Sequence, residues 1–154
     1  MKRFLLWLSI PLLAWYVSGH WYQLMLIQGR SMEPTYHHLQ LVILNKHDRS
    51  FQHGDVVAFR CDGLSSVVVK RVIAGPEDSA QIVDGTLLVN ERTSEVFTES
   101  GRFAYAGELE ELITLGNEEY LVIGDNTNES IDSRYPEVGT VSEIDILGKI
   151  VTVD

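Results

Sequence analysis

Beyond residue 22 the chain alternates between short apolar runs and turn-forming residues, which is the pattern of a β-rich domain. Between two of these runs stands Asp84-Gly85, a dipeptide that suits the positive φ angles of a two-residue hairpin turn. Helical periodicity is weak except at 108–115. We therefore predict antiparallel strands at Leu24–Ile27, Leu39–Leu44, Asp55–Phe59, Ser66–Ile73, Gln81–Val83, Thr86–Val89, Tyr120–Ile123 and Ile146–Val153.

Residues 91–119 depart from this pattern because they are acidic, polar and poorly periodic. We interpret them as a surface insertion. Together with the hairpin that precedes them, they make 75–119 a hairpin and small insertion within one β-rich domain of residues 23–154.

The N-terminal segment is of a different kind. Residues 4–22 are largely apolar and would extend about 28 Å as a helix, at ~1.5 Å per residue, which is enough to cross a bilayer. Residues 1–3 include two basic side chains, which would hold the N-terminus in the cytoplasm and leave 23–154 outside. A cleaved signal peptide is the alternative, but no small-x-small cleavage site follows. Aromatic residues of the kind found at membrane interfaces are Trp15, Tyr16, Trp21 and Tyr22.

Composition excludes several classes of function. A net charge of −10 argues against binding to nucleic acid, whose phosphates require Lys and Arg. The histidines lie in polar stretches without ligands at metal-binding spacing, so we expect neither a metal nor another cofactor. The single cysteine, Cys61, cannot form an internal disulfide.

Two residues suggest hydrolysis. Ser31 lies in Gln28–Thr35, and Lys70 closes a β-branched run that could form a dry wall around its amine. A lysine of ordinary pKa is neutral about once in 2,500 molecules at pH 7, so it can serve as a general base only if burial lowers its pKa. Taken singly, the serine could belong to an ordinary loop and the lysine to a solvated strand end.

Four motifs follow one another in a recognisable order. They are Ser31–Pro34, Gly54–Phe59, Lys70-Arg71 and Gly124–Arg134, behind an apolar N-terminus. In this order the chain resembles the type I signal peptidases, membrane-bound serine proteases of the Ser/Lys type. The resemblance runs from the apolar segment to about Gly148, apart from 91–119, and implies a signal-peptidase-like domain of coiled antiparallel sheets.

The resemblance also implies roles for residues. Ser31 would be the nucleophile, Lys70 its general base, and Ser130 the residue that orients the lysine, although spacing alone leaves Ser133 as a competitor. The oxyanion would be bound by the amide of Ser31, with help from groups near Gly29. Asp132 and Arg134 would form a structural ion pair, with exposed surface charge as the alternative, and further residues that shape the site would be Met32, Pro34, Gly124, Asp125 and Asn126.

The substrate would be an extended segment that pairs with the strand edges Leu24–Gly29 and Val67–Lys70. We expect Leu26, Gln28, Val67 and Val69 to contact it. By resemblance the partners are signal peptides of exported precursors, cut after Ala-x-Ala, and the lipid bilayer, with the protein a single-pass protein of a bacterial cell membrane. Alternatives are a self-cleaving repressor domain and a membrane-tethered, non-catalytic assembly factor on the same scaffold.

Overall fold

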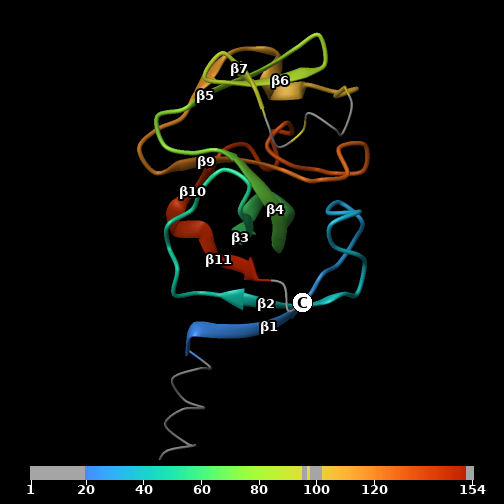
Figure 1. Cartoon of the computed structure of the whole chain (residues 1–154), viewed down its shortest axis with the longest axis vertical. Helices are drawn as coiled ribbons and strands as arrows, with labels where there is room; N and C mark the ends of the chain where they lie inside the picture. The colour runs from blue at the N-terminus through green and yellow to red at the C-terminus, as the bar shows by residue number, and fades with distance from the viewer. Residues whose placement is uncertain (1–19, 95–96, 98–101, 152–154) are drawn as a thin grey trace, which may run out of the picture.

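Two antiparallel sheets make up the computed structural model, which describes residues 20–94, 97 and 102–151. The larger sheet has seven strands in the order β1-β2-β11-β3-β4-β9-β10 (Figure 1). Its strands are β1 (Tyr22–Leu26), β2 (Leu41–Asn45), β3 (Val56–Cys61), β4 (Ser66–Ala74), β9 (Glu119–Ile123), β10 (Val141–Ser142) and β11 (Ile146–Val151).

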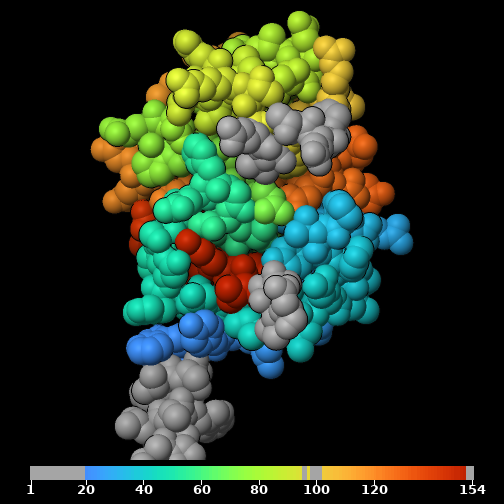
Figure 2. Space-filling view, in the orientation of Figure 1, coloured from blue at the N-terminus to red at the C-terminus, as the bar shows by residue number. Residues whose placement is uncertain are grey.

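The second sheet has four strands in the order β7-β6-β5-β8 and lies at the end of the molecule opposite β1 (Figures 1 and 2). Its strands are β5 (Ser79–Val83), β6 (Thr86–Val89), β7 (Arg92–Thr93) and β8 (Ile113–Thr114). Short 3₁₀ helices η1 (Asp62–Leu64), η3 (Gly107–Glu110) and η4 (Glu143–Asp145) complete the regular structure.

Strands β4 and β9 carry cores on both of their faces, because neighbouring residues of a strand point to opposite sides. Val72 and Val122 belong to a cluster on one side of the sheet, whereas Ile73 and Ile123 belong to the cluster that includes the second sheet. A third cluster contains Ile27, Met32, Tyr36, Val42, Leu44, Val56, Ala58 and Ile150, and it supports the segment that follows β1.

The predicted strands are present, with shifts of one or two residues at most ends, and the last two positions of the strand predicted at 146–153 lie outside the described residues. The hairpin turn is confirmed, because Asp84 and Gly85 have φ angles of 50° and 75°. Leu39, which we placed in a strand, lies outside β2 and has a φ of 64°, which is incompatible with extended backbone. Strands β7, β8 and β10 were missed, since two residues each are too short to show periodicity.

The helical periodicity that we noted at 108–115 does not correspond to an α-helix. The 3₁₀ helix η3 covers only the first residues of this segment, and β8 begins at Ile113, where it pairs with β5. Tertiary packing decides this conformation, since Leu109 is fully buried in the core of the second sheet. The segment 91–119, which we interpreted as a surface insertion, supplies other residues to that core as well, namely Phe97, Phe103 and Leu115.

The anchor that we predicted at 4–22 lies outside the described residues, except for its last three positions. Of these, Tyr22 is the first residue of β1. No helix among residues 20–94, 97 and 102–151 combines the length and hydrophobicity of a transmembrane span.

Candidate active site

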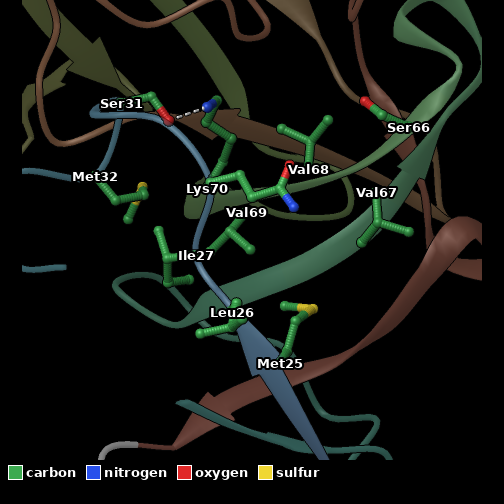
Figure 3. Close-up of a pocket in the computed structure, with 11 residues that line it drawn as sticks. Met25, Leu26, Ile27, Ser31, Met32, Ser66, Val67, Val68, Val69 and Lys70 are labelled. Carbon is green, nitrogen blue, oxygen red and sulfur yellow. Dashed lines mark hydrogen bonds between the residues drawn. The ribbon is translucent and has the colours of Figure 1, made fainter. Parts of the chain in front are cut away.

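Ser31 and Lys70 lie on different elements whose side chains meet. Lys70 is on β4. Ser31 begins a turn that is separated from the end of β1 by residues 27–30. The Nζ atom of Lys70 donates a hydrogen bond of 2.6 Å to Oγ of Ser31 (Figure 3). The turn is held by Met32, which is 1% exposed and whose carbonyl accepts a 2.8 Å bond from the Tyr36 N–H.

The surroundings of Lys70 change its acidity. The side chain is only 3% exposed. Burial disfavours the charged ammonium and lowers the pKa of Lys70 to about 8, although the charge of Asp132 opposes this change. The amine therefore has the property that the sequence-based hypothesis requires, a substantial neutral population near neutral pH.

The segment that follows β9 holds the serine turn in place. The Asn126 N–H donates a 3.0 Å bond to the Ser31 carbonyl, and Asn126 Nδ2 donates a 3.3 Å bond to the Arg30 carbonyl. Gly124 packs so closely that a Cβ at this position would lie 2.5 Å from the Ser31 carbonyl oxygen. Gly124 and Asn126 thus fix the backbone that carries the nucleophile candidate.

Arg71 is a site residue to which sequence reasoning gave no role. Its Nε donates a 2.7 Å bond to Oδ1 of Asp125, and its Nη1 donates a 2.7 Å bond to the Gly54 carbonyl. A longer bond of 3.3 Å joins Nη2 to Oγ1 of Thr35 in the serine turn. The guanidinium of Arg71 therefore links its own motif, Lys70-Arg71, to the motifs that contain Gly54 and Asp125. The only signal in the sequence was its position next to Lys70.

Asp132 and Arg134 form an ion pair that is buried rather than on the surface. Arg134 Nε lies 2.8 Å from Oδ1 of Asp132, and the side chains are 1% and 0% exposed. The pair also closes the turn, since Asp132 Oδ2 accepts the Gly124 N–H at 3.1 Å and Arg134 Nη2 donates to the Thr127 carbonyl at 2.9 Å. Because both side chains also form hydrogen bonds with the backbone, this buried ion pair holds the turn in one conformation.

The structure distinguishes the two competing serines. Ser133 Oγ accepts a 3.0 Å bond from the Val122 N–H, so its hydroxyl is engaged by the backbone of β9. Ser130 Oγ is buried and has no hydrogen-bond partner in the part of the chain that the structure describes. The bond to Lys70 that the resemblance implies is therefore not formed here. A free hydroxyl is nevertheless available at Ser130 and not at Ser133.

Gly29 is engaged in a way that the sequence did not suggest. Its N–H donates a 3.0 Å hydrogen bond to Nδ1 of His38, and its φ of 91° suits glycine. The neighbouring backbone is hydrogen-bonded to the same loop, since the Leu39 N–H donates a 2.8 Å bond to the Ile27 carbonyl. The amide of Gly29 is thus occupied by His38 and would have to leave it before it could bind an oxyanion.

A cleft of about 500 Å³ extends from Ser31 and Lys70 between the end of β1 and the first half of β4 (Figure 3). The backbone edge of β4 is open here, because pairing with β9 begins only at Arg71. The cleft is lined by all the substrate-contacting candidates, Leu26, Gln28, Val67 and Val69, together with Met25, Ile27, Met32, Ser66 and Val68.

The described residues contain no group of three or more His, Cys, Asp or Glu side chains that could hold a metal ion. At this site a hydroxyl lies beside an amine of lowered pKa, next to an open strand edge.

Comparison with known proteins points to one family. The family model described as signal peptidase, peptidase S26, matches residues 1–153. Signal peptidase I P of Bacillus subtilis subsp. natto is 29% identical over 133 residues, which cover 80% of this chain and 71% of that protein. Signal peptidase I U of Bacillus subtilis (strain 168) is 31% identical over 139 residues, with coverages of 82% and 72%.

A solved structure gives the same result. The crystal structure of a signal peptidase I from Enterococcus faecalis V583 superposes with a TM-score of 0.55 at 25% sequence identity. The match covers 66% of this chain and 97% of that one.

Proposed function

The chain belongs to the signal peptidase family, peptidase S26, and from this premise we propose that Ser31 and Lys70 are its catalytic pair. Its activity is that of a signal peptidase I, a serine endopeptidase that removes signal peptides from precursor proteins. One observation carries the proposal of the pair: the 2.6 Å hydrogen bond between a hydroxyl and a buried lysine amine.

In the reactive state Lys70 is neutral and the hydrogen bond runs from the Ser31 hydroxyl to the amine. With a pKa of about 8, roughly a tenth of the molecules hold this state at pH 7. Ser31 Oγ attacks the scissile carbonyl as Lys70 takes its proton, and the resulting ammonium then protonates the leaving amine. The same amine next deprotonates the water that hydrolyses the acyl-enzyme.

Ser130 would orient the amine, and its buried, unpaired hydroxyl supports this role. Catalytic hydrogen bonds are often long or absent before substrate binds, so the bond from Ser130 to Lys70 would form in the complex. The amide of Ser31 would bind the developing oxyanion. Gly29 could be the second donor only after its N–H leaves His38.

The precursor would bind as an extended strand between residues 24–29 and the open edge of β4. Leu26, Gln28, Val67 and Val69 would contact its side chains, and the small Ala residues of an Ala-x-Ala sequence would lie in the apolar part of the cleft. Main-chain pairing would supply affinity and the cleft walls specificity.

A membrane anchor at 4–22, with 1–3 in the cytoplasm and the catalytic domain of 23–154 outside, would hold the cleft at the outer surface of a bacterial cell membrane. Precursors are retained at the same surface by their own apolar segments. Tethering both partners raises their effective concentration without any new contact.

The proposal is tested by cleavage of a purified secretory precursor in neutral detergent. We expect Ser31→Ala to lower kcat by at least about 10⁴-fold, since removal of a nucleophile leaves only the residual effect of binding and oxyanion stabilisation. Ser142→Ala, on β10 and remote from the cleft, is the matched control and should cleave like the parent. Activity of a folded Ser31→Ala protein near the parent level would remove Ser31 from the mechanism.

A further inference from the structure

A second hollow continues the cleft along β4. It has a volume of about 380 Å³ and shares Ser66 and Val67 with the cleft at Ser31. Both shared residues lie at the end of the cleft that is far from Ser31 (Figure 3). The other residues that line this distal hollow are Arg60, Cys61, Asp62 and Ser65.

Arg60 is the cationic group of the distal hollow. It lies on β3 directly opposite Val67, so the two side chains are cross-strand neighbours on one face of the sheet. Arg60 is exposed, and no ion pair or hydrogen bond joins its side chain to another described residue. Asp62, the other charged residue here, lies beyond the end of the strand in η1. Arg60 is therefore the cation of the distal hollow, on the strand next to β4.

We propose that the distal hollow binds the part of the precursor about five to six residues before the cleavage site, and that Arg60 selects an acidic side chain there. This inference rests on the proposed function, in which residues before the cut occupy the cleft. Ser66 precedes Lys70 by four positions, and an extended chain advances about 3.3 Å per residue, so the distal hollow begins about 13 Å along β4 from Lys70. A carboxylate at that distance can meet the guanidinium in a charge-assisted pair.

The test compares three precursors that differ only at positions five and six before an unchanged Ala-x-Ala site. They carry Asp, Asn or Lys, and kcat/KM is measured with the full chain in neutral detergent. We expect Asp to exceed Lys by about three- to five-fold, with Asn between them, because exposed ion pairs are weak. The preference should shrink in about 1 M salt, where the Debye length is about 3 Å.

Three variants identify the residue responsible. Arg60→Glu should reverse the order so that the Lys precursor is cut faster, and Arg60→Gln should abolish the preference without reversing it. Arg92→Glu changes the net charge equally but lies on β7 in the second sheet, so it should keep the order of the parent.

Two results would overturn the inference: an Asp-to-Lys ratio that Arg60→Glu and Arg60→Gln leave unchanged, or a reversal that Arg92→Glu produces equally. The Asn precursor separates this failure from a failure of the proposed function. If the parent cuts it and Ser31→Ala does not, the proposed function stands whatever the charge preference. If the parent cannot cut it, the proposed function itself is at fault.

Discussion

The two ends of the molecule bury different kinds of side chain. Around Ser31, the larger sheet and the segment after β9 enclose Lys70 together with the pair Asp132–Arg134, all less than 4% exposed. The second sheet packs on an apolar cluster, which includes Leu87 and Leu109.

This contrast shows how the protein divides stability from chemistry. An apolar cluster gains free energy from every buried side chain. A buried amine or ion pair must instead offset the loss of hydration through hydrogen bonds and partners. The site is therefore expected to be stabilised less by its own residues than by the apolar clusters around it. Variants of Lys70 and of the second sheet should accordingly differ in whether they change activity or stability.

Lys70→Met should give the largest separation of activity from stability. We expect kcat to fall by at least about 10⁴-fold, because the general base is lost. The folded state should become more stable by about 2 to 3 kcal/mol at pH 7, since a buried amine is replaced by an apolar side chain of similar length. Precursor cleavage and urea denaturation measure the two effects. An active or strongly destabilised Lys70→Met protein would contradict this interpretation.

Asp132→Asn should be the most destabilising change in the site. The substitution leaves the guanidinium of Arg134 buried without its carboxylate partner. Breaking a buried ion pair in this way lowers the free energy of unfolding by about 3 to 5 kcal/mol. Thermal denaturation of this variant measures the loss. Asp125→Asn is the comparison, because its partner Arg71 is less buried and should yield a smaller loss. Equal stabilities of parent and Asp132→Asn would mean that the pair does not hold the turn.

Leu109→Ala should lower stability by about 2 to 5 kcal/mol through the cavity that it leaves, yet preserve kcat per folded molecule. The residue is fully buried but lies in the cluster of the second sheet, away from the cleft. Denaturation and cleavage at a temperature where the variant remains folded measure the two quantities. A large loss of kcat in the folded variant would show that the second sheet takes part in shaping the site.

The change of pH should produce the smallest of these effects. Because only neutral Lys70 is a base, kcat/KM should rise about ten-fold per pH unit below its pKa and level off above about 8. Stability should follow the same group. The unfolded chain binds its proton more tightly than the fold does, so stability rises between pH about 8 and 10.5, and Lys70→Met should remove that rise. An acid limb centred near 6.5 would instead indicate a histidine.

Much of the fold could be predicted from local patterns. The alternation of apolar runs with Gly, Asp and Asn predicted the longer strands, and the preference of Asp84-Gly85 for positive φ predicted the hairpin. Strands of two residues carry no periodicity, so β7, β8 and β10 were invisible. The weak helical periodicity at 108–115 did not produce an α-helix, because long-range packing of Leu109 outweighs a weak local preference.

For the site, the sequence by itself determined which residues are present and in what order. Each of the motifs around Ser31, Lys70 and Gly124 is an unbroken stretch of the chain and can be recognised without a structure. Only the tertiary structure decided their geometry. The bond between Ser31 and Lys70, the bridge from Arg71 to Asp125, and the occupation of Gly29 by His38 each join positions that are separated along the chain. Burial has the same origin, because the pKa of Lys70 depends on what the folded chain packs around its amine, and no local pattern encodes that environment.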